Sequence, residues 1–359
     1  MAYTTIDDPS AHFQVKTYSG NSTQTAITFD GSSNLQPDWI WAKQRGGAHY
    51  HDLRDTNRGL TKRLVSAISD GEGTKSASYV SFDSNGFTLG DDQSGGSDAN
   101  TVNSNGNTYV SWCWKANGGT TSSNSNGSIT TTVQANTTAG FSIVTWTGTG
   151  SNATIGHGLG VTPKWIIVKQ RNATRSWEVF HSSIPSMNTK YIELNTTAAA
   201  STYSPVWGGT DPTSTTFHVG TDNSTNNNSG SFIAYCFAEK KGYSKFGSYT
   251  GNGSTDGTFI YTGFRPAWFM YKSTSSVQNW IIQDNKRANS FNEINADFRA
   301  NVSDAENTNT SYNDIDFLSN GIKLREDNND QNQSGGTYIY MAFAESPFVN
   351  SNGVPTNAR

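Results

Sequence analysis

The sequence is poor in charge and in long apolar runs, and each shortage excludes a class of protein. Asp, Glu, Lys and Arg make up 15% of the 359 residues, well below the roughly 25% of an average soluble domain. The net charge is −4 and no basic run is present, so we expect no nucleic-acid partner. No apolar stretch approaches the roughly 18 residues of a membrane-spanning helix, so we expect no membrane insertion.

The beginning of the chain lacks the pattern of a secretion signal. Residues 1–12 are polar and contain no apolar segment behind a positively charged start, which is the arrangement that directs secretion. We therefore expect synthesis in a cytoplasm and release by a route such as cell lysis.

The short motifs of the commoner enzyme classes are also missing. The sequence has no Gly-x-Ser-x-Gly, no phosphate-binding Gly-x4-Gly-Lys, no His-Glu-x-x-His and no dinucleotide-binding glycine pattern. We therefore predict a protein that is not an enzyme, with no catalytic, cofactor-binding or metal-binding residues. Two alternatives stay open: Ca²⁺ in the oxygen-rich loops at Asp91–Asp92 and Glu326–Asp330, and a metal pair at His49 and His51, for which a loop setting is favoured.

Aromatic residues and glycines are abundant instead. Aromatics make up 12% of the chain, which contains 35 glycines. Disordered chains lack aromatics, and helical proteins are rich in Ala, Leu, Glu and Lys. Aromatic and β-branched runs between Gly, Asn and Ser clusters are typical of strands and turns. The sequence therefore predicts an all-β fold.

Four sequence signatures recur three times in the same order. The clearest is Pro-x-Trp followed by an apolar strand and a lysine, at Pro37–Lys43, Pro163–Lys169 and Pro266–Lys272. The others are aromatic-x-Gly at 18–20, 146–148 and 249–251, a short strand at 84–89, 216–219 and 319–324, and the most apolar strand at 108–114, 231–237 and 337–343. We infer three diverged copies of one unit of roughly a hundred residues.

The spacing of these signatures divides the chain. Each copy has the strand and turn pattern of a β-sandwich of jelly-roll or lectin-like type. The extra length between the first two copies is rich in Gly, Ser, Thr and Asn, a composition that predicts a linker. The predicted division is an N-terminal docking arm at 1–12, β-sandwich repeats at 13–116, 141–240 and 245–348, a linker at 117–140 and a C-terminal tail at 349–359.

Several strands are apolar on both faces, as in Trp165–Val168. Such a strand suits either the centre of a sandwich or a sheet whose second face meets another copy, and the sequence leaves both open. Cys113, Cys236 and Ala342 share one position in the last strand of the three copies. A small buried residue explains all three better than a disulfide or a metal pair.

Four aromatic residues lie in polar, loop-like sequence and are candidates for surface recognition of sugars. The alternative is that they anchor loops against the sandwich, and the sequence favours this alternative. The four candidates are Tyr50, Tyr203, Trp207 and Tyr312.

Several motifs resemble a module of marine bacteriophage virion proteins, and together they cover nearly the whole chain. They are Phe13–Gly20, Leu35–Lys43, Asp55–Gly59, Ser84–Gly90, Tyr109–Ala116 and Met341–Val349. The resemblance carries over no catalytic or ligand residues. The second copy departs from the pattern, because His181–Pro185 stands where the first copy has Asp55–Gly59.

This resemblance implies a tail-fibre-like structural protein in which tandem sandwiches form a long rod. We expect a tail fibre or tail-associated protein that contacts the host surface, located in the virion, assembled in the host cytoplasm and released by lysis. The alternatives are a capsid-decorating virion protein and a carbohydrate-binding, lectin-like module outside the virion. The expected partners are other virion proteins, further copies of the chain in a homo-oligomer such as a trimer, and a host surface glycan or receptor.

Overall fold

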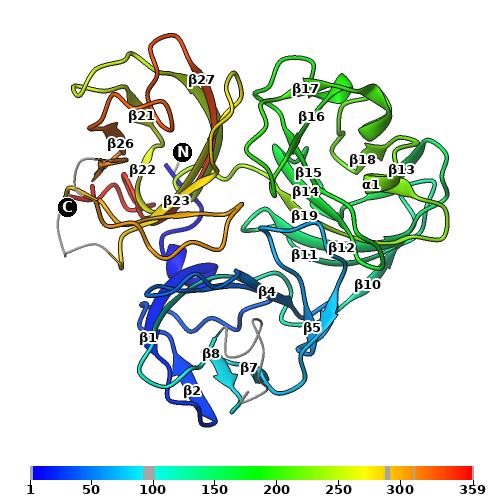
Figure 1. Ribbon diagram of the computed structural model, residues 1–359, viewed down its shortest axis with the longest axis horizontal. Helices are drawn as coiled ribbons and strands as arrows, with labels where there is room; N and C mark the ends of the chain where they lie inside the picture. The colour runs from blue at the N-terminus through cyan, green and yellow to red at the C-terminus, as the bar shows by residue number, and fades with distance from the viewer. Residues whose placement is uncertain (1–2, 92–101, 288–291, 310–311, 358–359) are drawn as a thin grey trace.

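The computed structural model describes residues 3–91, 102–287, 292–309 and 312–357. Within these residues the regular secondary structure consists of strands, one four-residue α-helix and three short 3-10 helices, which confirms the predicted all-β fold. Three lobes lie around a common centre, in chain order from blue to red (Figure 1). In the described part of the chain, no helix has both the length and the apolar character needed to cross a membrane.

The first lobe spans residues 13–114 and follows the 3-10 helix η1 (Pro9–Ala11). Its main sheet has the order β1 (Phe13–Ser19), β9 (Thr108–Trp114), β3 (Trp39–Gln44), β4 (Asp52–Asp55). Its second sheet has the order β2 (Thr25–Thr28), β8 (Gly86–Leu89), β7 (Tyr79–Asp83), and a small pair is formed by β5 (Lys62–Arg63) and β6 (Gly73–Thr74).

The second lobe spans residues 122–237. Its main sheet has the order β10 (Ser122–Asn124), β11 (Thr131–Asn136), β12 (Phe141–Thr147), β19 (Ser231–Phe237), β14 (Trp165–Gln170), β15 (Trp177–His181), β16 (Lys190–Glu193), β17 (Ser201–Thr202). The pair β13 (Ala153–Gly156) and β18 (Thr216–Val219) forms its second sheet, and its helices are η2 (Met187–Thr189), η3 (Ser204–Val206) and α1 (Asn223–Asn226).

The third lobe spans residues 244–347. Its main sheet has the order β20 (Ser244–Thr250), β27 (Thr337–Pro347), β22 (Phe264–Ser273), β23 (Ile281–Asp284), β24 (Asp297–Arg299). Its second sheet has the order β21 (Phe259–Tyr261), β26 (Gly321–Leu324), β25 (Ile315–Leu318).

Four strands follow one order in all three main sheets. They run β1-β9-β3-β4 in the first lobe, β12-β19-β14-β15 in the second and β20-β27-β22-β23 in the third. The register agrees as well, because the Trp of each Pro-x-Trp strand pairs with an aromatic residue of the last strand: Trp39 with Trp114, Trp165 with Phe237 and Trp268 with Phe343. Three copies of one unit would produce this arrangement, and the repeat itself stays a prediction.

The predicted small residues of the last strand are buried in each lobe. Cys113, Cys236 and Ala342 are each fully buried, and they pair with Ile40, Ile166 and Phe269 on the neighbouring strand. Both cysteines are free thiols, and burial raises the pKa of each thiol above its usual range. This confirms the interpretation of the position as a small buried residue.

In the first and third lobes the two faces of the main sheet serve different cores, whereas in the second lobe both faces belong to the same core. In the first lobe, Ile40, Ala42 and Cys113 face the second sheet and form a local core with residues such as Phe87. Because alternate residues of a strand point to opposite faces, the tryptophans of β3 and β9 point the other way. They enter a core that contains residues of all three lobes. The sequence left two settings open for strands that are apolar on both faces. The structure shows the second of them, a sheet whose second face packs against the other lobes.

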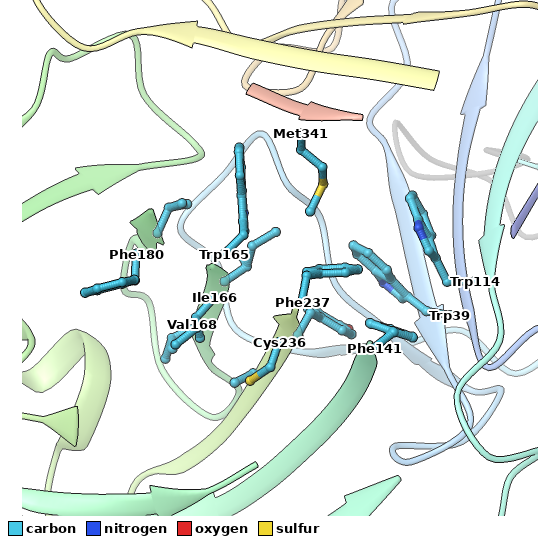
Figure 2. Close-up of a cluster of buried hydrophobic side chains, with 14 of the residues drawn as sticks. Trp39, Trp114, Phe141, Trp165, Ile166, Val168, Phe180, Cys236, Phe237 and Met341 are labelled. Atoms are coloured by element: carbon cyan, nitrogen blue, oxygen red, sulfur yellow. The ribbon is translucent and has the colours of Figure 1, made fainter. Parts of the chain in front are cut away.

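Aromatic rings from all three lobes meet in this central core (Figure 2). The ring centroids of Trp39 and Tyr235, in the second lobe, are 4.2 Å apart. Those of Trp114 and Phe343, in the third lobe, are 5.6 Å apart. Figure 2 shows Trp39, Phe237 and Met341 converging from the three lobes. The expected rod is therefore wrong: the lobes bury their apolar faces against one another around a centre, and do not stack end to end.

The segment predicted as a linker, 117–140, contains two strands of the second main sheet. β11 pairs with β12 from Thr132–Thr145 to Asn136–Phe141, and β10 pairs with β11. Its polar composition resembles that of a flexible linker, but Thr131, Val133 and Gln134 of β11 are buried. Backbone pairing with β12 gives this segment a defined structure.

The predicted N-terminal docking arm is folded onto the third lobe over its described residues. Ile6 is buried, Thr4 Oγ1 donates a hydrogen bond to Lys241 O at 2.8 Å, and Ser351 N donates one to Asp7 Oδ1 at 2.7 Å. Residues 3–12 therefore do not form a free arm. The predicted C-terminal tail is held in the same region, where Arg265 Nη1 donates a hydrogen bond to Asn357 O at 3.0 Å.

Candidate functional site

The four aromatic residues predicted for surface recognition do not form one site. Trp207 is 1% exposed and packs edge-on against Phe180 with 5.6 Å between ring centroids. Trp207 is therefore not available for surface recognition, and its buried ring agrees with the alternative that the sequence favoured, a loop anchor packed against the fold. The polar sequence around Trp207 describes its loop and not the direction of its side chain.

The other three candidates are distributed over the three lobes. Tyr50 is half-buried in the first lobe, and Tyr203 is 48% exposed in the second. The hydroxyl of Tyr312, in the third lobe, donates a hydrogen bond to Asp330 Oδ2 at 2.6 Å, which is the contact of a loop anchor. Their role in recognition stays a prediction for three separate positions.

The structure does bring aromatic residues together at the edge of the third lobe, on strand β21. Phe259 and Tyr261 are 44% and 53% exposed, whereas Ile260 between them is buried. Both rings therefore lie on the outer face of β21, about 7 Å apart along the strand. With Tyr3 and Phe348 they form what we call the β21 aromatic patch.

The N-terminal segment completes this patch. Tyr3 donates a hydrogen bond to Gly263 O at 2.8 Å, and its hydroxyl lies 3.2 Å from that of Tyr261. Lys241 Nζ lies 4.4 Å from the centroid of the Tyr3 ring, and Phe348 packs edge-on against the same ring at 6.3 Å. Burial and the Tyr261 hydroxyl raise the pKa of Tyr3, so its phenol stays neutral.

Exposed rings held in place by such contacts can stack on the apolar face of a sugar or of a peptide side chain. The sequence analysis missed this patch because Phe259–Tyr261 has the composition of a buried strand. The available signal was the alternation of the strand, which places residues 259 and 261 on one face and residue 260 on the other.

A second group of functional interest joins the first lobe to the second. Arg58 Nε lies 2.6 Å from Asp55 Oδ2, and both side chains are fully buried. The hydroxyl of Tyr235, in the second lobe, donates to the same oxygen at 2.7 Å. An ion pair in the first lobe is thus completed by a donor from the second lobe.

The same arrangement joins the third lobe to the first. Arg287 Nε lies 2.6 Å from Asp284 Oδ2, and Trp112 Nε1 donates to that oxygen at 2.9 Å. Asp284 and Asp55 are equivalent in register, because they pair with Trp268 and Trp39.

At the equivalent position of the second lobe stands His181, which pairs with Trp165. Its Nε2 lies 3.3 Å from Tyr340 O in the third lobe. The three inter-lobe contacts therefore run from first to second, from second to third and from third to first, which closes a ring. The departure of the second copy at His181–Pro185 is a substitution within this ring.

Each Pro-x-Trp strand also holds a buried lysine. Lys43, Lys169 and Lys272 are 0% exposed, and burial lowers the pKa of each to about 7. Lys43 Nζ donates to Gln44 O and Gly47 O, and Lys272 Nζ donates to Ser273 O and Ser276 O in the same way. Lys169 Nζ donates to Arg175 O in the loop after its strand at 2.6 Å, and also to Ser69 O of the first lobe at 2.8 Å. These lysines bind the loops that follow their strands.

The proposed metal positions have other contacts. His51 is buried; its Nδ1 accepts a hydrogen bond from Trp41 Nε1 at 2.8 Å and its Nε2 lies 3.1 Å from Arg299 O. Over the described residues, no group of three or more His, Cys, Asp or Glu side chains is arranged to hold a metal ion. Of the acidic pair suggested for Ca²⁺, Asp92 lies outside the described residues.

Comparison with known proteins gives a family for the chain. No curated protein matches it, and no solved structure does. Residues 8–347 match a family described as a domain of unknown function (DUF7483). This match includes all three lobes and the whole ring of inter-lobe contacts, and the chain belongs to that family.

Proposed function

We propose that this protein is a non-enzymatic structural component of a bacteriophage particle, as a tail fibre or tail-associated protein that contacts the host surface. The observation that supports this best is the central core, to which all three lobes contribute. A chain whose lobes share one core and are joined by hydrogen bonds to buried aspartates behaves as a rigid block. Rigidity of this kind suits a part of a particle that must keep its shape outside the cell.

The resemblance to virion modules adds to this proposal, since the motifs that carry it form the structural framework. Leu35–Lys43 contains most of strand β3, and Tyr109–Ala116 contains most of β9. These segments supply Trp39 and Trp114 to the central core. The resemblance is therefore a resemblance of architecture, and it supports a structural role more strongly than a particular receptor.

A second candidate function is carbohydrate binding, which the β21 aromatic patch favours. Phe259 and Tyr261 present rings on one face of a strand, and Lys323, which pairs with Phe259 across the sheet, adds a hydrogen-bond donor beside them. Lys323 Nζ lies 2.6 Å from Asp256 Oδ1. Together these residues offer stacking surfaces with polar groups at the margin, as a sugar requires.

The proposal is tested by immunogold electron microscopy on phage particles that encode this chain. Gold on the tail supports the tail-fibre proposal. Gold over the head would identify a capsid-decorating protein and refute the host-contact role. Absence of gold from intact particles would refute the virion proposal and leave carbohydrate binding as the remaining candidate.

The second candidate is tested by glycan binding to the intact protein and to the double variant Phe259→Ser/Tyr261→Ser. Val277→Ser is the matched control, because Val277 is a 67% exposed apolar residue of the same lobe outside the patch. If the patch binds sugar, the double variant loses binding and the control keeps it. Equal glycan binding by the double variant and by the control would show that the sugar binds outside the patch.

A further inference from the structure

The strand that begins the shared four-strand order is β1, β12 or β20, and its outer side is covered by a further strand in the second lobe alone among the described strands. In the second lobe, β12 is covered by β11, which is in turn covered by β10. In the first lobe the equivalent strand β1 is the terminal strand of its sheet among the described strands. Figure 1 shows β1 at the outer side of the first lobe, next to the third. The chain therefore contains one covered version of this edge, at β12, and two open ones, at β1 and at β20 in the third lobe; the edge of β1 is the one that borders a cavity between the first and third lobes.

The covered edge shows what kind of segment fits there. β11 has the sequence Thr-Thr-Val-Gln-Ala-Asn, without charge, and runs antiparallel to β12. Gln134 reaches from this strand to the first lobe, where its Oε1 accepts a hydrogen bond from Thr56 Oγ1 at 2.7 Å. A polar but uncharged strand thus fills the junction between two lobes and satisfies a polar group on the far side.

At the open edge of β1, the equivalent junction between the first and third lobes contains a cavity of about 360 Å³. Gln14 and Val15 of β1 line one side of it. They are equivalent to Ser142 and Ile143, which pair with Ala135 and Gln134 in the second lobe. The cavity therefore lies where a strand like β11 would lie.

The far side of the cavity contains a polar group without a partner. Asn285 lines the cavity and is equivalent to Thr56, since each follows the aspartate of its inter-lobe contact. Its side chain is 5% exposed, and its Oδ1 forms no hydrogen bond to any residue that the structure describes. A buried acceptor without a partner has lost its hydrogen bonds to water, and a donor placed beside it would offset that cost. The amide of a glutamine at the position of Gln134 is such a donor.

Four of the five charged side chains that line the cavity form ion pairs, and the fifth, Asp8, accepts hydrogen bonds from the hydroxyls of Ser10 and Ser33. Lys286 Nζ lies 3.4 Å from Asp30 Oδ1, and Arg265 Nε lies 3.3 Å from Glu345 Oε2. An uncharged occupant leaves these pairs intact, whereas a charged one would have to compete with them.

We propose that the open edge of β1 and its adjoining cavity bind an extended, uncharged strand of a partner protein. The strand adds to β1 as β11 adds to β12, through backbone hydrogen bonds along the edge. It carries β-branched residues and places a Gln or Asn side chain opposite Asn285. This surface extends the proposed structural role, because it supplies a site for assembly with a second protein.

The test uses the full-length protein and a labelled synthetic peptide of residues 128–137, which contains β11. We expect saturable binding by fluorescence anisotropy, with slower amide hydrogen exchange in β1 and unchanged exchange in β12. The control peptide carries Thr132→Pro and Gln134→Pro, which remove backbone donors, and it should not bind.

Two substitutions test the Asn285 contact from its two sides. Asn285→Leu should weaken peptide binding about tenfold, the factor that corresponds to one hydrogen bond, while Asn188→Leu in the second lobe should leave binding unchanged. Gln134→Leu in the peptide should weaken binding by a similar factor, and this measurement does not depend on the folding of a protein variant.

Absence of saturable binding up to millimolar peptide would overturn the proposal, as would binding that protects segments other than β1. A dimer in sedimentation with protected β1 would show that a second copy is the occupant, which also overturns the assignment to a partner protein. Immunogold labelling tests location on the particle and the peptide assay tests this surface, so failure of one is distinguishable from failure of the other.

Discussion

The indole N–H of Trp112 donates a hydrogen bond of 2.9 Å to Asp284 Oδ2 across the boundary between the first and third lobes. The two residues are 172 positions apart in the chain. The acceptor is an aspartate that already pairs with Arg287, and the guanidinium lies 5.6 Å from the Trp112 ring. Tyr235 and Asp55 repeat this relationship between the second and first lobes. The buried charges of one lobe are therefore satisfied by the next lobe, which makes the lobes energetically dependent on one another.

Replacement of Trp112 by Phe should lower the free energy of unfolding by about 1–3 kcal/mol, because it removes one donor from a buried carboxylate. The measurement is denaturant unfolding. Trp146→Phe is the matched control, since the indole N–H of Trp146 has no hydrogen-bond partner within the described residues. Equal losses in both variants would show that ring size and not the hydrogen bond is responsible.

Removal of either buried guanidinium should destabilise the protein much more. Arg58→Met or Arg287→Met leaves a fully buried aspartate without its cation, a change that costs about 3–5 kcal/mol. Lys16→Met breaks an ion pair with Asp30 that is partly exposed to solvent and should cost less than about 1 kcal/mol. Urea unfolding of the three variants compares them, and similar losses would contradict the role assigned to the inter-lobe contacts.

Truncation in the central core should weaken all three lobes together. Trp39→Ala removes a ring that contacts Trp114 and Tyr235, and should cost about 3–5 kcal/mol. Hydrogen exchange should quicken in the core strands β19 and β27 as well as in β3, because the lobes unfold as one unit. Faster exchange confined to the first lobe would mean that the lobes are independent.

Acidification should destabilise the protein through His181. Its Nδ1 accepts a hydrogen bond from Ser183 N at 3.0 Å, so the folded state requires a neutral ring, and burial lowers the pKa of His181 to about 3. The unfolded histidine titrates near pH 6.5, so the unfolded state binds more protons as the pH falls below 6.5 and stability is lost. Stability measured from pH 7 to pH 4 should fall less steeply in His181→Gln, whereas His218→Gln should follow the wild type more closely.

Alkaline pH should have the opposite effect through the buried lysines. Burial lowers the pKa of Lys43, Lys169 and Lys272 to about 7, from a usual value of 10.5. Between these two values the unfolded state binds more protons than the folded state, so stability rises as the pH increases from 7 towards 10. Lys43→Met and Lys272→Met should each flatten this rise in thermal unfolding, and unchanged slopes would show that the ammonium groups stay charged when buried.

Local pattern was sufficient for much of the architecture. The Pro-x-Trp strands and the final apolar strands lie where the signatures placed them, and the shared position of Cys113 and Cys236 is buried in both lobes. Composition was less reliable where backbone pairing decides the structure. The segment 117–140 has the residues of a linker, yet β11 is held by β12, because a strand with a paired backbone needs few apolar side chains.

The sequence by itself determined the Pro-x-Trp strands, the final apolar strands and their apolar faces, because these follow from the period of side chains along a strand. Only the tertiary structure decided that the second faces meet in one core, that Trp207 is buried, and that Tyr3, Phe259 and Tyr261 lie together. These relationships join residues that are far apart in the chain, such as Tyr3 and Tyr261. They depend on how the lobes are oriented, which no local period along the chain encodes.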